Sequence, residues 1–254
     1  MTLPSKSSTA FILGATGGIG AALSRRLAKA GWQLALCARN PERLAELGNE
    51  LGARTAAADA TDLTSLENAF TKGCESFEHI DGVVNCAGSL LLKPAHLTTE
   101  AEWNTVLAQN LTTSFHLLRT AASRMMRSGG GSIVFLASAV ARRGMINHEA
   151  IAAAKAGVLG LAQSAAATYA RYNIRVNCVA PGLTRTPLTD SLTKSEASLK
   201  ASTALHPLGR IGEPNEIASA IEWFLSPEQS WVTGQVLAVD GGLSSVQSRA
   251  VAGT

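Results

Sequence analysis

The most constraining feature of the sequence is a glycine-rich turn that joins a short apolar strand to a helix. Residues 9–14 are apolar without polar alternation, as expected of a strand covered on both faces. The turn Gly14-Ala-Thr-Gly17-Gly18-Ile-Gly20 follows, and a helix is expected over 21–30. Glycines let a backbone approach a ligand closely, and a helix amino end offers unpaired N–H groups to a pyrophosphate. The turn therefore indicates dinucleotide binding, although an ordinary strand-to-helix turn can also contain such glycines.

Apolar strands and helical segments alternate along the rest of the chain. With 254 residues and no repeat or linker, this pattern predicts a single domain over 1–254. We expect an α/β fold, a three-layer Rossmann-type doubly wound parallel sheet of about seven strands with helices on both faces. The expected strands lie at 9–14, 33–38, 54–58, 80–84, 132–137, 174–180 and 232–242. Helices are expected at 21–30, 42–51 and 100–127, around Lys155, and from Pro214 onward.

Composition narrows the classes of partner. The net charge of +3 is small and dispersed, which argues against nucleic acid or a membrane surface. No apolar run of about 18 residues suggests a membrane span, and the first residues lack a signal peptide's apolar segment. The four cysteines show no CxxC spacing, so we expect reduced thiols in a cytoplasmic protein rather than disulfides or a metal site.

Two strand ends carry candidate functional residues. Ser138 follows the strand at 132–137, and Lys155 lies on the next helix one turn after Ile151, so the crevice of a parallel sheet would bring Ser138 and Lys155 together. Arg39 follows the strand at 33–38, where an acidic residue would hold a ribose hydroxyl and an arginine suits a 2′-phosphate. This favours NADP(H) over NAD(H), although Arg39 could also be a solvated arginine.

These motifs, in this order over about 9–242, resemble the short-chain dehydrogenase/reductase family, most closely its β-ketoacyl carrier-protein reductases. Asn85-Cys86-Ala87-Gly88 is similar to the family's Asn-Asn-Ala-Gly, and 181–186 fits its PGxxxT motif. The resemblance implies dinucleotide contacts from residues spread over these motifs. They are Gly14, Thr16, Gly17, Gly18, Ile19, Gly20, Arg39, Asp59, Ala60, Asn85, Ala87, Gly88, Lys155, Pro181, Gly182, Thr184 and Thr186.

The resemblance also implies a catalytic set of Ser138, Lys155 and Asn110, with a tyrosine four residues before the lysine. That position holds Ile151, which cannot move a proton. In the family, hydride passes from the nicotinamide to a carbonyl carbon while the tyrosine, its pKa lowered by the lysine, protonates the oxygen. The family asparagine kinks its helix and holds a water on the lysine; an exposed helix asparagine is the other interpretation of Asn110.

Three hypotheses remain open for the reaction. The chain is a reductase whose substrate needs no tyrosine acid, such as an iminium or an activated double bond; another side chain replaces the tyrosine; or the chain is a non-catalytic dinucleotide-binding subunit or sensor. The nearby candidate acids are His148, Glu149 and Tyr169, although His148 could equally cap the helix start. Tyr169 lies about 27 Å from Ile151 along the helix, which excludes it.

The remaining expectations concern substrate and assembly. Residues 187–212 have the Ser/Thr/Lys-rich composition of a mobile lid over the site. Arg142 and Arg143 either meet an anionic small-molecule substrate or lie on a solvated loop. The resemblance implies a homotetramer or dimer built on the last strand and the Lys155 helix.

Overall fold

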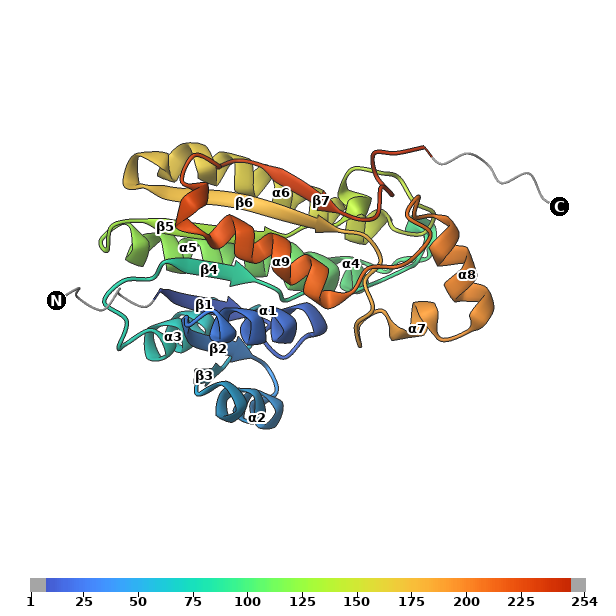
Figure 1. Ribbon diagram of the computed structural model, residues 1–254. Coiled ribbons are helices and arrows are strands. Elements are labelled where there is room, and N and C mark those ends of the chain that lie inside the picture. The colour runs from blue at the N-terminus through green and yellow to red at the C-terminus, as the bar shows by residue number, and fades with distance from the viewer. Residues whose placement is uncertain (1–7, 248–254) are drawn as a thin grey trace.

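A seven-stranded parallel sheet forms the centre of the protein in the computed structural model, which describes residues 8–247 (Figure 1). The strand order is β3-β2-β1-β4-β5-β6-β7, so the chain reverses direction across the sheet between β1 and β4. Ligands bind at such a reversal in open parallel sheets. The strands are β1 (Thr9–Leu13), β2 (Gln33–Ala38), β3 (Arg54–Ala57), β4 (Gly82–Asn85), β5 (Gly131–Leu136), β6 (Ile174–Pro181) and β7 (Val236–Val239). The predicted fold class and strand number are confirmed.

Helices cover both faces of the sheet. One buried cluster joins the sheet to α1, α2 and α9, and another joins it to α3, α5 and α6. The helices are α1 (Gly18–Lys29), α2 (Pro41–Leu51), α3 (Leu63–Gly73), α4 (Glu100–Leu107), α5 (Thr113–Met125), α6 (Glu149–Tyr169), α7 (Asp190–Thr193), α8 (Glu196–Ala204) and α9 (Pro214–Leu225). Short 3-10 turns lie at η1 (Ala95–Leu97), η3 (Ala139–Ala141), η4 (Ala170–Tyr172) and η5 (Pro227–Gln229). Every β-to-α connection therefore begins at one edge of the sheet, where functional side chains can gather.

Local signals in the sequence set several helix starts. The Asp62 carboxylate accepts the N–H of Ser65 and caps α3, as the sequence predicts. Asn40 caps α2 in the same way. Helix α1 begins at Gly18, three residues earlier than predicted, because the second half of the glycine turn is already helical. The earlier start brings the first N–H groups of α1 to the carboxyl end of β1.

The long helix predicted over 100–127 is interrupted in its middle. A π-helical segment, η2 (Ala108–Thr112), separates α4 from α5 and contains Asn110. The Asn110 side chain is fully buried, so the exposed-asparagine interpretation is wrong. A π-helical bulge of this kind changes the hydrogen-bond pattern of the helix and is frequent at functional sites.

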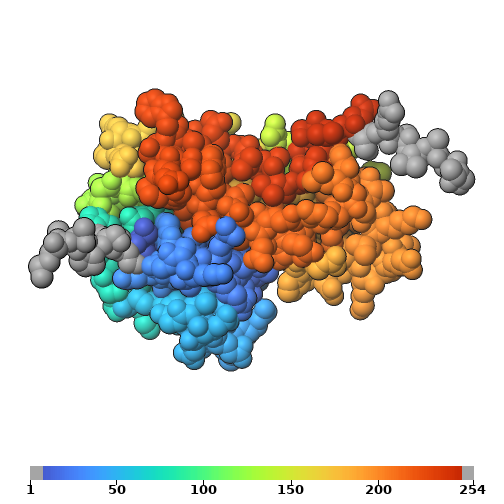
Figure 2. Space-filling view, in the orientation of Figure 1, coloured from blue at the N-terminus to red at the C-terminus, as the bar shows by residue number. Residues whose placement is uncertain are grey.

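The segment predicted as a lid, 187–212, carries two short helices, α7 and α8. In the space-filling view its orange atoms border the blue residues of the N-terminal half (Figure 2). His206 and Ile211 near its end are buried, so its C-terminal part is anchored to the domain. The mobility of this segment stays a prediction.

One helical stretch within residues 8–247, Glu149–Tyr172, is long and apolar enough to cross a membrane by length and composition alone. The expectation of no membrane span was based on the absence of a long apolar run. The stretch is weak evidence for a span, because α6 packs along β6 and supplies Val158, Ala162 and Ala165 to the core. The core helix of a globular domain meets the same two criteria.

The four cysteines carry free thiols in this structure. Burial raises the pKa of each of them, Cys37, Cys74, Cys86 and Cys178, to about 12. Such thiols stay protonated at neutral pH and are poor nucleophiles and metal ligands. Within the described part of the chain, no group of three or more His, Cys, Asp or Glu side chains is placed to hold a metal ion.

Candidate active site

A cavity of about 310 Å³ lies at the chain reversal, between the carboxyl ends of β1, β2 and β4 and the start of α1. Most of the predicted dinucleotide-binding residues line it. These are Gly14, Thr16, Gly17, Gly18, Ile19, Arg39, Asp59, Ala60, Ala87, Gly88 and Thr186. The motifs therefore predicted one cavity from residues that are far apart along the chain.

The glycines of the first turn are required by close backbone approaches. Gly14 has a φ of +76°, and a Cβ there would lie 2.5 Å from the backbone nitrogen of Ala87. A Cβ on Gly18 would lie 2.7 Å from a side-chain carbon of Thr186. A Cβ on Gly20 would collide with the carbonyl oxygen of Gly14. The turn is thus compressed so that the helix start stays open toward the cavity, the arrangement that a pyrophosphate needs.

Two guanidinium groups and one carboxylate lie at the far end of the cavity. Arg39 follows β2, and Arg43 in the first turn of α2 donates a hydrogen bond of 3.2 Å to the carbonyl of Thr16. The Asp59 carboxylate accepts the N–H and the hydroxyl of Thr61, and these bonds, aided by the Arg39 charge, lower its pKa. An anionic Asp59 and exposed cations beside it fit the adenosine end of a phosphorylated dinucleotide.

Gly88, Asn110 and Lys155 meet at the other end. A Cβ on Gly88 would lie 2.9 Å from Oδ1 of Asn110 and 3.5 Å from Nζ of Lys155. The Asn110 amide donates to the Ser89 hydroxyl at 2.9 Å and to the Val106 carbonyl at 3.0 Å. The loop after β4 therefore passes close to both the Asn110 amide and the Lys155 ammonium group, with a glycine at the point of closest approach.

Lys155 is a buried cation, 8% exposed. Its Nζ donates a hydrogen bond of 2.9 Å to the carbonyl of Leu136 at the end of β5. Burial lowers the Lys155 pKa to about 8, an effect that the nearby Cys178 and Cys86 oppose. At neutral pH the ammonium form prevails and offers two further N–H donors toward a ligand.

Ser138 and Ile151 flank this end of the site in different ways. Ser138 is half-buried, and its hydroxyl accepts the N–H of Val140, which leaves its own hydrogen free to donate. Ile151 is 3% exposed and belongs to a buried apolar cluster with Val106, Ala150 and Ala154. The position where the resemblance predicts a phenol is therefore an apolar packing position.

Comparison with known proteins agrees with this geometry. A family model described as Enoyl-(Acyl carrier protein) reductase matches residues 14–244. The chain is 34% identical to the 3-oxoacyl-[acyl-carrier-protein] reductase FabG of Vibrio cholerae, over 92% of this chain and 96% of the other. It is 32% identical to a tropinone reductase homologue of Arabidopsis thaliana, over 93% and 92%. This chain belongs to the short-chain dehydrogenase/reductase family.

Solved structures of the family superpose closely on this one. A short-chain type dehydrogenase/reductase from Mycobacterium ulcerans has a TM-score of 0.91 at 30% identity, covering 97% of this chain and 93% of the other. A single-residue variant of actinorhodin polyketide ketoreductase, solved with NADPH, also has a TM-score of 0.91 at 30% identity, covering 96% and 100%. The chain is therefore an oxidoreductase-type protein of this family with the family's nicotinamide dinucleotide fold.

Several residues that the family resemblance assigns to the dinucleotide lie behind the cavity lining. Asn85 is buried; its amide donates to Ser114 at 3.0 Å, and its Oδ1 accepts the N–H of Ala87. The Thr184 hydroxyl donates to the carbonyl of Gly182 at 3.1 Å. Pro181 pairs with β7, and Gly20 packs on the glycine turn. In this short-chain dehydrogenase/reductase they shape the loops that carry the lining residues.

Other lining residues were not predicted from the sequence. They include Asn40, Arg43, Thr61, Gln109, Thr113 and Leu188. Arg43 could have been found from its spacing, because it lies one helical turn after Arg39 across a capped helix start. Gln109 lies next to Asn110 in the π-helical segment, and Thr113 is the first residue of α5. The π-helical segment and the start of α5 therefore both contribute side chains to the lining of the dinucleotide cavity.

The loop between Ser138 and α6 is tied to the domain at two points. The Arg143 guanidinium donates to the carbonyl of Leu243, and the N–H of Lys93 donates to the carbonyl of Asn147 at 2.8 Å. Arg143 is thus a structural residue in this arrangement, and Arg142 is exposed. His148 holds the N-cap position of α6 but makes no side-chain cap, since its Nδ1 contacts the carbonyl of Ile146 at 2.7 Å.

Proposed function

We propose that this chain is an NADP(H)-dependent oxidoreductase that reduces a small organic molecule at a C=N bond, an activated C=C bond or a carbonyl without a tyrosine acid. The observation that carries the proposal is the continuity of the site. A dinucleotide cavity with Arg39 and Arg43 at one end leads to Gly88, Asn110 and Lys155 at the other, beside an apolar Ile151.

The choice of NADP(H) is supported by charge. The end of β2 presents Ala38, Arg39 and Asn40 in turn, with Arg43 shortly after, and none of these four side chains is a carboxylate that would repel a 2′-phosphate. Guanidinium groups bind phosphate through charge-assisted hydrogen bonds. A family neighbour was solved with NADPH, which is consistent with the same preference here.

Lys155, Ser138 and Ile151 have different roles in the proposed reaction. A nicotinamide dinucleotide in this site would supply hydride to the substrate. Lys155 would hold its ribose hydroxyls through the N–H groups that the Leu136 carbonyl leaves free, and Ser138 would donate a hydrogen bond to the heteroatom of the substrate. Ile151 donates no proton. A positioned acid is worth roughly 10²–10⁴-fold, so ketone reduction is slow, and substrates that need no proton during hydride transfer are favoured.

A second function has its own supporting observation. Ile151 is fully integrated into an apolar cluster, which is what a dinucleotide-binding subunit or sensor without turnover would show. The proposal of some catalysis rests on the retention of Ser138, Asn110 and Lys155 around the site.

The test is direct. We would measure binding of NADPH and NADH to the unmodified protein by fluorescence, and then NADPH oxidation with panels of ketones, cyclic imines and enones. Turnover of imines or enones well above that of ketones supports the proposal. Tight NADPH binding with no turnover on any panel supports the sensor function instead, and binding of neither dinucleotide refutes both.

We also propose a cytoplasmic homo-oligomer, a tetramer or dimer. Trp231 is 99% exposed, and Leu237 on the edge strand β7 and Trp223 on α9 are also exposed. Large apolar side chains gathered around an edge strand are typical of an interface. Light scattering on the purified protein gives the oligomeric state.

A further inference from the structure

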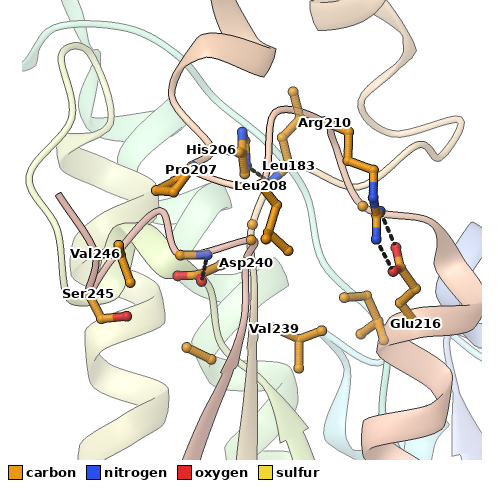
Figure 3. Close-up of a pocket in the computed structure, with 16 residues that line it drawn as sticks. Leu183, His206, Pro207, Leu208, Arg210, Glu216, Val239, Asp240, Ser245 and Val246 are labelled. Atoms are coloured by element: carbon orange, nitrogen blue, oxygen red, sulfur yellow. Dashed lines mark hydrogen bonds and ion pairs between the residues drawn. The ribbon is translucent and has the colours of Figure 1, made fainter. Parts of the chain in front are cut away.

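A second cavity, of about 510 Å³, lies at the carboxyl ends of β6 and β7 (Figure 3). It shares no lining residue with the dinucleotide cavity among the residues that the structure describes. Its wall contains two buried polar side chains, His206 and Asp240, of which His206 is 4% exposed. A buried histidine that the proposed chemistry does not use needs a role.

Both ring nitrogens of His206 are bonded to the backbone of other residues. Nδ1 lies 2.8 Å from the carbonyl oxygen of Ser202 on α8, and Nε2 lies 3.2 Å from the backbone nitrogen of Leu183, which donates to it. A carbonyl only accepts and a backbone N–H only donates, so Nδ1 carries the proton and Nε2 does not. These two hydrogen bonds therefore select one tautomer of the neutral imidazole.

Leu183 begins the loop that reaches the dinucleotide cavity. Thr186 and Leu188 of this loop line that cavity, and the Thr186 side chain lies against Gly18. The loop is also held by Gly212, whose N–H donates to the Leu183 carbonyl at 2.9 Å. His206 is thus the side chain that links the lid helix α8 to the start of the loop carrying Thr186.

We propose that His206 is a positioning residue for the dinucleotide site, and that its protonation weakens the attachment of the loop carrying Thr186 at Leu183. A protonated Nε2 would place an N–H against the N–H of Leu183, so the bond becomes a donor–donor contact. The proposal rests on the proposed function, because it assigns the effect to dinucleotide binding. Histidine is the side chain that ordinarily changes charge between pH 5 and 8.

Three charged groups line the second cavity together with His206. The Asp240 carboxylate at the end of β7 accepts the N–H groups of Gly242 and Ser244 and the hydroxyl of Ser244. Arg210 and Glu216 pair with each other through two hydrogen bonds, and the pKa of Glu216 is lowered to about 2, mainly by Arg210. The charges of Arg210 and Glu216 thus largely cancel, and Asp240 is the remaining charged group among the described residues of the cavity lining.

The test compares NADP⁺ binding by calorimetry from pH 8.5 to 5.5 in the wild type, His206→Gln and His206→Leu. Glutamine can present an acceptor to Leu183 but does not titrate, and leucine offers no acceptor. We expect the wild-type Kd to rise about tenfold more than the His206→Gln Kd as the pH falls, the equivalent of one hydrogen bond. His206→Leu should bind weakly at every pH.

Controls separate this effect from other titrations. The 2′-phosphate titrates equally in all variants, and His96→Gln, at an exposed histidine on η1, should keep the wild-type profile. Identical profiles for the wild type and His206→Gln, or wild-type affinity in His206→Leu at pH 8.5, overturn the proposal while leaving dinucleotide binding intact. Absence of NADP⁺ binding by the wild type at pH 8.5 instead refutes the proposed function.

The NMR signal of the Leu183 amide then reports whether the loop responds to His206 protonation, and an unchanged signal overturns the proposal by itself.

Discussion

Replacing Ile151 with tyrosine should create ketone reductase activity. The side chain at this position lies one turn before Lys155, whose pKa of about 8 keeps it cationic at pH 7. A neighbouring ammonium stabilises a phenolate and lowers the phenol pKa from its ordinary value of about 10. The acid so formed should raise kcat/KM for ketones by roughly 10²–10⁴-fold, or about 3–5 kcal/mol of transition-state stabilisation.

The same substitution should cost stability. Ile151 is 3% exposed and packed against Val106, Ala150 and Ala154, so a larger ring must displace its neighbours. Overpacking of this kind typically costs about 1–3 kcal/mol of unfolding free energy. The cost reduces stability and leaves the rate gain visible, provided the assay is run well below the melting temperature.

The matched control is Ile151→Phe, which adds the same ring without the hydroxyl. Both variants should bind NADPH and lose similar stability in urea titrations, while only Ile151→Tyr gains ketone turnover in an NADPH-oxidation assay. Equal ketone rates in the two variants, both with NADPH bound, would refute the reasoning that a single proton donor is missing.

Four further predictions follow from other parts of the structure. Arg39→Ala should weaken NADPH binding by about tenfold or more and leave NADH binding nearly unchanged, because one charge-assisted bond to phosphate is lost; equal losses for both dinucleotides would contradict it. Gly18→Val should abolish binding of both dinucleotides while the far-ultraviolet circular dichroism stays native, since its side chain would enter the space between the turn and Thr186; retained binding would show that the cavity is elsewhere. Lys155→Met should raise the unfolding free energy by on the order of 1–3 kcal/mol at pH 7, and by less at pH 9.5. Between pH 8 and 10.5 the folded protein binds fewer protons than the unfolded chain. The destabilisation by the buried ammonium is therefore complete below pH 8 and disappears as the pH rises to 10.5. A stability gain of Lys155→Met that increases with pH would contradict this prediction. Asp62→Ala should lower stability by about 1 kcal/mol through the lost cap of α3 without changing the NADPH Kd, and an altered Kd would mean that α3 reaches the site.

The sheet and most of the dinucleotide cavity could be predicted from the sequence because both depend on local signals. Apolar runs set the strands, and the glycines at 14, 18 and 20 mark where side chains cannot fit. The alternation of these strands with helices predicted the doubly wound parallel sheet, whereas the strand order comes from the structure. Asn110 was also identified in advance, because an asparagine in the middle of an apolar helix needs a reason, and the structure places it in a π-helical segment.

What the sequence did not reveal depends on contacts between distant loops. His206 lies in a polar, lid-like stretch, and nothing nearby in the sequence marks it as buried between α8 and the end of β6. The resemblance assigned Asn85 and Thr184 to the cofactor, but their hydrogen bonds to Ser114 and Gly182 are set by tertiary packing. The surroundings of Ile151 were likewise invisible, since they come from α4 and α6 together.

The way in which the loop from Ser138 to α6 is held has a consequence for how freely its sequence can vary. It is fastened by the Arg143 guanidinium on a backbone carbonyl and by the backbone pair of Lys93 and Asn147, so the side chains between these points are not required to hold its course. Gly144, Met145 and Ile146 are therefore free to vary. Combinatorial libraries restricted to these three codons should yield folded proteins at high frequency, and these proteins should bind NADPH as the unmodified protein does.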